Sequence, residues 1–348
     1  MERIRLGRMG MLVSRLGFGG IPIQRDSEEE AIAIVRRCLE LDINFLDTAN
    51  AYTTSEERIG KAIAGRKREE LVIATKTTSR SRDGVAHHLE LSLKRLACGW
   101  IDLYQFHNIS DAESLRAVLD PHGPLAVVKE AQAAGLVRHI GITSHHMDTA
   151  KQAVRSDCFA TMMFSFNFIT SEAADELLPL CREHDVGFIA MKPLAGGMLD
   201  NAPLAFKYLL QFPDVLLLVG IEKIHEIGEI AAVMNGPAEL TAAERAELQR
   251  MCKELGPRFC RRCDYCQPCV VDIPISIVMQ APSFLKRLPA QSVFSGWIAD
   301  AMEKAAGCTD CGECEERCPF HLPIREMIAE HVRTYGEAKK HYEAGTRA

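Results

Sequence analysis

The chain has 348 residues, of which 47% are hydrophobic and 25% charged, and its formal net charge is −6. These values are ordinary for a globular protein, and a negative balance without an extended basic run argues against a nucleic-acid partner. Apolar runs such as 215–219 are far too short to cross a bilayer, and the N-terminus lacks a signal-peptide core. We therefore expect no membrane association and a cytoplasmic location.

Strand and helix patterns alternate along the first two thirds of the chain. A short strand, turn and strand occupy 3–13, and Ser27 with Glu30 is a capping-box pattern that predicts a helix from residue 28. Further strands are predicted at 16–20, 43–47, 71–76, 101–106, 136–143, 159–164, 186–190 and 215–219. Helices are predicted at 28–41, 55–65, 83–97, 111–134 with an interruption at 121–124, 147–154, 171–184, 203–212, 223–234 and 241–255.

This pattern amounts to eight strand–helix units over roughly 220 residues, a size typical of a TIM barrel. Continuous apolar strands fit a parallel sheet that is covered on both faces. The alternative, a doubly wound open sheet, requires a glycine-rich phosphate loop, and Gly17-Phe18-Gly19-Gly20 lacks that spacing and enters no helix directly. We therefore predict an α/β fold with a (β/α)8 barrel over residues 1–255, in which these glycines allow close backbone approach at the barrel mouth.

Three polar side chains stand where predicted strands end. Asp47, Lys76 and His107 each follow an apolar run, and Tyr52 lies five residues after Asp47. We expect the three strand ends to converge on one face of the barrel. A tyrosine acts as a general acid only if its pKa of about 10 is lowered, which a nearby buried cation achieves. Taken singly, each residue is also readable as structural: a loop-capping carboxylate, a surface lysine or a buried histidine.

The composition changes at residue 256, where we predict a small, mostly helical second domain over 256–348. Its predicted helices lie at 275–288, 292–306 and 323–343. It holds eight of the 13 cysteines, namely Cys260, Cys263, Cys266 and Cys269, then Cys308, Cys311, Cys314 and Cys318. The second run, followed by Pro319, matches the C-x2-C-x2-C-x3-C-P spacing of bacterial ferredoxins, which predicts two [4Fe–4S] clusters. Zinc is the alternative, because paired cysteines also build zinc sites.

By analogy with those ferredoxins, the cysteines are shared between the two runs. Cys318 joins the first three cysteines of the first run on one cluster, and Cys269 joins the first three of the second run on the other. The domain is accordingly expected to be ferredoxin-like.

Residues 1 to about 240 resemble the aldo-keto reductase family. The motifs are Asn44-Phe45-Leu46-Asp47-Thr48-Ala49 with Tyr52, Val72-Ile73-Ala74-Thr75-Lys76, Ile101-Asp102-Leu103-Tyr104-Gln105-Phe106-His107 and Arg138-His139-Ile140-Gly141-Ile142-Thr143-Ser144. The whole chain resembles the subgroup of this family that carries a ferredoxin-like [4Fe–4S] extension. The resemblance implies an NAD(P)-dependent enzyme in which Tyr52 gives a proton to a carbonyl oxygen. Lys76 would lower the tyrosine pKa, Asp47 would pair with Lys76, and His107 would orient the carbonyl.

The resemblance also implies the cofactor contacts Asp47, Thr143, Ser144, Met191, Lys192, Pro193, Leu194, Gly196 and Gly220. Thr143 and Ser144 replace the usual Ser and Asn, while Met163 and Met191 stand where Gln and a stacking aromatic residue are common. The basic residues that hold the 2′-phosphate of NADP fall on Gly220 and Glu226, with Lys223 or His225 as replacement cations, so NAD and NADP both stay open. His145 is readable as a residue at a helix start or as a contact to cofactor or substrate.

Three functions fit this sequence. The first is a reductase of a small-molecule carbonyl, or dehydrogenase of an alcohol, with two appended clusters. The second is an electron-transfer subunit that exchanges electrons with ferredoxin or another redox protein, and the third gives the clusters a purely structural role. Hydride transfer moves two electrons whereas each cluster accepts one, and no flavin motif is present, so it stays open whether the clusters exchange electrons with the barrel.

Overall fold

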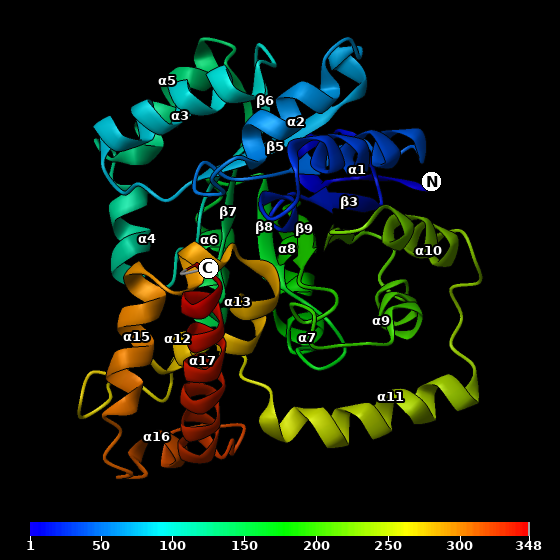
Figure 1. Cartoon of the computed structure of the whole chain (residues 1–348). Coiled ribbons are helices and arrows are strands. Elements are labelled where there is room, and N and C mark those ends of the chain that lie inside the picture. Colours follow the sequence, from blue (N-terminus) through cyan, green and yellow to red (C-terminus); the bar gives the residue numbers. More distant parts are fainter. Residues whose placement is uncertain (347–348) are drawn as a thin grey trace. The chain divides into compact units, whose positions relative to one another are not determined.

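Eight parallel strands close into a barrel in the computed structural model of the chain, which describes residues 1–346 (Figure 1). The last strand pairs with the first, which confirms the predicted (β/α)8 barrel. The barrel strands are β3 (Leu16–Gly19), β4 (Phe45–Asp47), β5 (Val72–Thr77), β6 (Ile101–Phe106), β7 (Val137–Thr143), β8 (Thr161–Ser165), β9 (Gly187–Met191) and β10 (Leu216–Gly220).

Helices connect the strands on the outside of the barrel (Figure 1). They are α1 (Glu28–Glu40), α2 (Ser55–Ile63), α3 (Arg82–Leu96), α4 (Ala112–Leu119), α5 (Pro124–Ala133), α6 (Met147–Arg155), α7 (Ala173–Glu176), α8 (Leu178–Glu183), α9 (Ala202–Leu209) and α10 (Ile224–Met234). The predicted capping box of Ser27 and Glu30 begins α1. The helix predicted at 171–184 is instead two short helices, because Pro179 falls in the first turn of α8 and lacks the N–H that a continuous helix needs.

An amino-terminal hairpin packs against the barrel interior. Strands β1 (Arg3–Arg5) and β2 (Leu12–Ser14) pair antiparallel, as predicted. Their apolar side chains join one buried cluster with inward-facing barrel residues: Ile4, Leu6, Met9, Val13, Phe45, Val72, Leu103, Met163, Ile189, Leu216 and Leu218. Gly7, at a φ of 48°, approaches so closely that a Cβ there would lie 2.1 Å from the nitrogen of Gly187, the first residue of β9. The hairpin therefore fills the amino-terminal end of the barrel.

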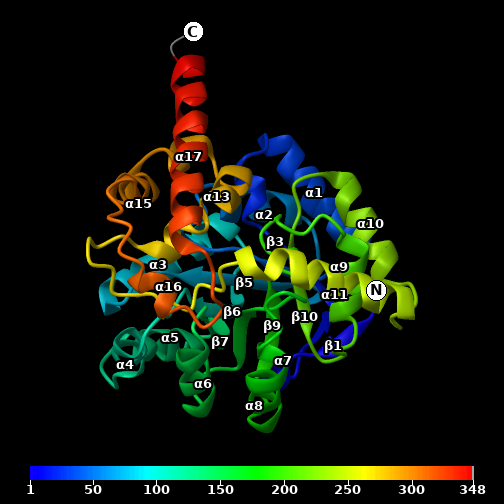
Figure 2. The same ribbon diagram turned by 90° about the horizontal axis from the view of Figure 1, so that it is seen from below.

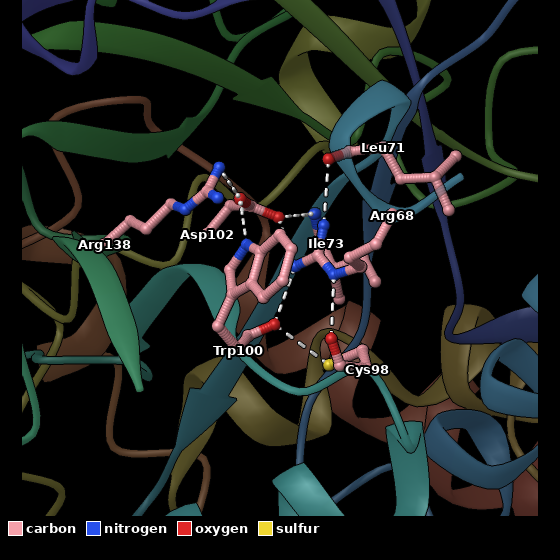
Figure 3. A network of polar contacts seen from close by, with 7 residues as sticks. All are labelled: Arg68, Leu71, Ile73, Cys98, Trp100, Asp102 and Arg138. Atoms are coloured by element: carbon pink, nitrogen blue, oxygen red, sulfur yellow. Dashed lines mark hydrogen bonds and ion pairs between the residues drawn. The ribbon is translucent and has the colours of Figure 1, made fainter. Parts of the chain in front are cut away.

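A charged network fastens β5, β6 and β7 together near their amino-terminal ends (Figure 3). The buried carboxylate of Asp102 accepts hydrogen bonds from Arg68 Nη2 at 2.5 Å, the Ile73 backbone at 2.9 Å and the Trp100 indole at 3.1 Å. Arg138 Nη1 donates to the same carboxylate at 3.2 Å. The guanidinium carbons of Arg68 and Arg138 each lie 4.4 Å from the centre of the Trp100 ring, a cation–π geometry.

The described chain divides into two compact units. The first contains Met1–Ala195 and Leu199–Ala242, and the second contains Gly196–Met198 and the chain from Ala243 onward. The helix α11 (Ala242–Leu255) thus groups with the second unit, although the composition changes only after it. The division into domains 1–255 and 256–348 stays a prediction.

The second unit is helical and has its own apolar core. After α11 come α12 (Ile275–Val278), α13 (Ala281–Arg287), α14 (Ala290–Val293), α15 (Gly296–Ala306), α16 (Glu313–Glu316) and α17 (Ile324–Thr346). Helices α12, α13 and α15 pack against the long helix α17. Figure 2 shows α13 and α15 beside it. The helix predicted at 275–288 is divided because Pro282 falls in the first turn of α13. Among residues 1–346, no helix combines the length and the apolar character that a membrane span requires.

Candidate functional site

An ion pair lies inside the barrel where β4 and β5 end. Lys76 Nζ is 2.5 Å from Asp47 Oδ2 and donates a second hydrogen bond to the Thr48 carbonyl oxygen at 2.7 Å. The other oxygen of Asp47 accepts a hydrogen bond from Gln105 Nε2 at 2.9 Å. The side chains of Lys76 and Asp47 are only 2% and 3% exposed. Because a buried charge is tolerated only beside a well-placed partner, these contacts hold both side chains in one geometry.

Tyr52 and His107 lie next to this ion pair. Lys76 Nζ is 5.2 Å from the centre of the Tyr52 ring, and the ring centres of Tyr52 and His107 are 5.7 Å apart in an edge-on arrangement. Tyr52 reaches this place because the chain turns back after β4, with the Tyr52 N–H donating to the Ala49 carbonyl at 2.9 Å. The structure therefore brings together Asp47, Lys76 and His107, the three strand-end side chains that were predicted to converge, and places Tyr52 beside them.

The electrostatics favour a charged lysine beside the tyrosine. Burial raises the pKa of the Asp47 carboxyl, although Lys76 and Gln105 act in the opposite direction. Burial also tends to lower the pKa of Lys76, but Asp47 and Tyr52 outweigh it, and the pKa of the lysine is raised. An amine with a raised pKa stays protonated at neutral pH. Lys76 therefore presents a positive charge to Tyr52.

Two polar residues of this region were not among the predicted site residues. Gln105 binds Asp47, and its alternation with Leu103 and His107 along one strand face could have indicated that it points into the barrel. Asn167, which is 1% exposed, follows β8 and donates from Nδ2 to the Lys192 carbonyl at 3.1 Å. It thereby links the loop after β8 to the loop after β9.

The predicted carboxamide contacts lie at the end of β7. Thr143 Oγ1 accepts a hydrogen bond from the Asn108 backbone at 2.7 Å, which leaves the hydroxyl proton of Thr143 for another partner. Ser144 Oγ donates to the Ile109 carbonyl at 2.7 Å and accepts from the His146 backbone at 3.0 Å. The Ser144 hydroxyl proton is therefore engaged, and the oxygen keeps one lone pair that can accept a hydrogen bond from a cofactor.

Further predicted positions lie at the ends of β8, β9 and β10. Met191, half-buried, ends β9 opposite Ser165 and packs against the interior cluster. Met163 is 2% exposed within that cluster, so the position where Gln is common is a core position here. His145 Nδ1 lies 3.0 Å from Ser165 Oγ. Gly220 ends β10 and is exposed.

The loop after β9 holds the remaining predicted contacts. Lys192 adopts a left-handed backbone conformation with a φ of 60°, and Pro193 and Leu194 follow it. Gly196 belongs to the second compact unit, where its carbonyl accepts a hydrogen bond from Ser283 Oγ at 2.9 Å. Gly196 is thus not grouped with the other predicted cofactor contacts.

A carboxylate occupies the amino-terminal end of α10. Glu226 Oε2 accepts hydrogen bonds from the backbone N–H groups of Glu222 and Lys223, both at 2.9 Å. A helix amino terminus is a place where an external anion would otherwise bind. Lys223 Nζ lies 4.0 Å from Asp26, so this cation already faces a carboxylate.

The eight cysteines of the second unit line two separate hollows. One is lined by Cys260, Cys263, Cys266 and Cys318, and the other by Cys269, Cys308, Cys311 and Cys314. Each hollow takes three cysteines from one run and the fourth from the other run. These are the two groups into which the ferredoxin analogy divides the cysteines.

The thiols differ in exposure between the two hollows. Cys266 and Cys318 are buried in the first, whereas Cys308 and Cys311 are exposed in the second. Burial raises the pKa of Cys260 to about 11 and that of Cys266 to about 12. Within residues 1–346, no group of three or more His, Cys, Asp or Glu side chains is arranged to hold a metal ion.

Known proteins resemble this chain over the barrel. A model of the Aldo/keto reductase family matches residues 15–204, more than half of the chain, and the match ends before the cysteine runs. The chain is 29% identical over 218 residues to the uncharacterised oxidoreductase YqkF of Bacillus subtilis strain 168, covering 59% of this chain and 68% of that protein. It is 33% identical over 234 residues to the uncharacterised oxidoreductase YrpG of the same organism, covering 59% and 70%.

The solved structure of the aldo-keto reductase AKR11C1 from Bacillus halodurans, in its holo form, superimposes with a TM-score of 0.62 at 26% identity. The match covers 72% of this chain and 96% of that protein. The family implies use of NAD(P)H, and its typical substrate is a small-molecule carbonyl. The chain is therefore an oxidoreductase that belongs to the aldo/keto reductase family.

Proposed function

We propose that this enzyme reduces a small-molecule carbonyl, or oxidises the matching alcohol, at the carboxyl-terminal end of its barrel, with Tyr52 as the proton donor. The observation that carries the proposal is the buried ammonium of Lys76, held by Asp47 and the Thr48 carbonyl and lying 5.2 Å from the centre of the Tyr52 ring. A fixed positive charge beside a phenol stabilises the phenolate, which makes the phenol a better acid.

Each residue then has one task during reduction. Tyr52 gives its hydroxyl proton to the carbonyl oxygen as negative charge develops there, and Lys76 stabilises the tyrosinate that remains. Asp47 keeps Lys76 charged and in place, since the pair is buried. His107, whose ring lies edge-on to Tyr52, orients the carbonyl by a hydrogen bond. Bound NAD(P)H supplies the hydride that the carbonyl carbon receives.

The cofactor is proposed to contact the strand ends around this group. Asp47 stands beside it, and the free hydroxyl proton of Thr143 suits a carboxamide oxygen. Met191 offers a half-buried thioether, which packs favourably on an aromatic ring. The other proposed contacts are Ser144, Lys192, Pro193, Leu194, Gly196 and Gly220.

We further propose a preference for NADH over NADPH. The carboxylate of Glu226 already occupies the backbone amides at the start of α10. A 2′-phosphate at this helix terminus would have to displace it or lie beside a like charge. Either event lowers the affinity for NADPH, whereas NADH has no 2′-phosphate and keeps its affinity.

The substitution Tyr52→Phe tests the proton donor. We expect kcat to fall by roughly 10²- to 10⁴-fold, the usual contribution of a general acid, while binding of NADH, followed by fluorescence, stays unchanged. Tyr104→Phe is the matched control, because Tyr104 is a fully buried tyrosine in β6. Carbonyl reduction at the unaltered rate by Tyr52→Phe would exclude Tyr52 as the donor.

We also propose that residues 256–348, the larger part of the second unit, form a ferredoxin-like domain that binds two [4Fe–4S] clusters. The support is the division of the eight cysteines between two hollows, four to each. A cubane is held by four thiolates, each on a different iron, so its ligands surround a volume and do not meet at one point. Cys260, Cys263, Cys266 and Cys318 would hold one cluster, and Cys269, Cys308, Cys311 and Cys314 the other.

The clusters serve one of three ends: electron exchange with the nicotinamide, electron exchange with ferredoxin or another redox protein, or support of the fold. Anaerobic purification followed by iron and sulfide analysis comes first, with roughly eight of each expected per chain. NADH and NADPH are then added separately without a carbonyl, and cluster reduction is followed by electron paramagnetic resonance. Reduction by either nucleotide shows one electron path; reduction by dithionite alone points to another partner or to a structural role.

Matched cysteine variants make this experiment specific. Cys311→Ala is expected to lose about half of the iron, because it lies at one hollow only. Cys252→Ala keeps the full amount, since Cys252 belongs to α11 and lines neither hollow. Zinc in place of iron in freshly prepared anaerobic protein would refute the cluster proposal.

A further inference from the structure

A second buried carboxylate lies behind the strand that carries Lys76. Glu56, near the start of α2, is 1% exposed. Its Oε1 accepts a hydrogen bond from Thr75 Oγ1 at 2.7 Å, and its Oε2 lies 3.3 Å from Arg95 Nη1 on α3. Thr75 immediately precedes Lys76, so the two side chains point to opposite faces of β5. Glu56 thus lies outside the barrel wall, directly behind the proposed catalytic lysine.

Arg95 extends this contact to the loop that carries Tyr52. The same Nη1 donates to the Asn50 carbonyl at 3.4 Å. The Asn50 N–H donates to the Lys76 carbonyl at 3.0 Å, and Asn50 Nδ2 donates to the His88 carbonyl at 3.4 Å. The loop is therefore tied to β5 and to α3 two residues before Tyr52.

The neighbouring acid shows how specific this arrangement is. The Glu57 side chain is 54% exposed, and its carboxylate lies 3.9 Å from Arg95 Nε. An exposed pair at that distance contributes little, because water screens it. Glu56, in contrast, places its charge in a poorly screened environment, where an electrostatic effect reaches further.

We propose that Glu56, through Thr75 and Arg95, is a positioning residue for proton donation by Tyr52: it fixes the loop of Tyr52 against β5 and holds a negative charge behind Lys76. The inference rests on the proposed function, because it assigns Glu56 a part in that same proton transfer. Glu56 acts through Lys76 and Tyr52 and touches neither substrate nor cofactor.

The titratable groups that sense the Glu56 charge come from several elements. They are Arg95, which binds it, and His88 on α3, Tyr104 on β6, and Lys76 on the opposite face of β5, while Glu57 is its neighbour along α2. Burial lowers the pKa of Lys76, and Asp47, Tyr52 and Glu56 together outweigh that effect. Loss of the negative charge of Glu56 therefore lowers the pKa of the Lys76 ammonium. For the same reason, it makes the charged phenolate form of Tyr52 more favourable.

The test measures the pH dependence of kcat for Glu56→Gln and Glu57→Gln. Glutamine keeps the shape and the bond from Thr75 but removes the charge. We expect Glu56→Gln to lower kcat on the order of tenfold and to move the basic limb of the profile to lower pH. Glu57→Gln should match the parent enzyme. A basic limb that does not move in Glu56→Gln, whatever happens to its melting temperature, would overturn the inference.

Arg95→Gln should shift the basic limb of the pH profile in the opposite direction, and it remains informative if Glu56→Gln fails to fold. Removal of this cation leaves the Glu56 charge uncompensated, so the basic limb should move to higher pH. An unmoved limb or a shift in the same direction as Glu56→Gln would contradict a role through charge. Tyr52→Phe is measured in parallel. If Tyr52→Phe keeps full activity, the proposed function fails. If Tyr52→Phe is inactive but the basic limb does not move in Glu56→Gln, only the inference about Glu56 is refuted.

Discussion

The polar groups of the barrel end and those of the cysteine-rich unit are satisfied in different ways. Asp47 and Lys76 are buried, yet each has partners from the protein itself, including Gln105 and the Thr48 carbonyl. The cysteines instead line two hollows, and burial raises the pKa of Cys260 and Cys266. The barrel site can therefore form from protein atoms alone, whereas thiolates in the second unit need a bound cation to become favourable.

The largest effect is expected when the buried pair of Asp47 and Lys76 in the barrel is broken. Lys76→Met leaves the Asp47 carboxylate buried without its cation, which should cost about 3–5 kcal/mol in the free energy of unfolding, together with most of the activity. Urea denaturation, monitored by the fluorescence of the barrel, measures the change in the free energy of unfolding. Lys61→Met is the control, because Lys61 on α2 forms an exposed pair with Glu28 on α1. Equal stability of the two variants would contradict a tightly coupled pair.

If the proposed clusters are present, their removal should affect the cysteine-rich second unit and leave the barrel unchanged. If clusters hold the second unit together, a chelator under oxidising conditions should raise amide exchange in α15 and α17 on the order of tenfold or more, while the barrel strands stay protected. Hydrogen exchange with mass spectrometry resolves both sets of helices and strands in one sample. Unchanged protection of α15 and α17 after complete loss of iron would rule out the structural role.

A smaller effect, on stability and not on activity, is expected from the network around Asp102 at the amino-terminal end of the barrel. Arg68 is 13% exposed and Arg138 42% exposed, although both bind Asp102 and lie against Trp100. Arg68→Ala should cost about 2 kcal/mol in the free energy of unfolding, and Arg138→Ala less than about 1 kcal/mol. Neither should change kcat, because this network lies at the amino-terminal end. A loss of turnover in either folded variant would show that the two ends are coupled.

The smallest expected effect concerns the nucleotide. Glu226→Gln keeps a cap on α10 but removes the negative charge, so NADPH should gain about two- to fivefold in affinity relative to NADH. Fluorescence titration with each nucleotide gives the ratio of dissociation constants without turnover. His225→Gln, at the adjacent position, is the control. An unchanged ratio in Glu226→Gln would place the 2′-position away from α10.

Most of the barrel could be predicted from sequence because its strands are continuous apolar runs and its helices begin with recognisable caps, as at Ser27. The convergence of Asp47, Lys76 and His107 could be predicted for a simple reason: parallel strands end on one face. Helix interruptions were harder, because Pro179 and Pro282 lie in segments whose apolar pattern continues across them.

The contacts behind the site could not be predicted in the same way. Glu56 stands in a charged stretch that reads as a solvated helix start, yet it is buried and contacts Thr75 on β5 and Arg95 on α3. The roles of Gln105 and Asn167 likewise depend on partners far along the chain, Asp47 and Lys192. Periodicity reports which side of an element is covered, but it does not report which residue covers it.

The amino-terminal hairpin fills one end of the barrel. Its side chains Leu6 and Val13 are fully buried in the cluster that lines the interior, and Gly7 abuts the start of β9. Side chains therefore fill the barrel at the end opposite to the Asp47–Lys76 pair. If the proposed function holds, substrate would reach Tyr52 and product would leave it on the carboxyl-terminal side, and the proton that restores the tyrosine would arrive on that same side.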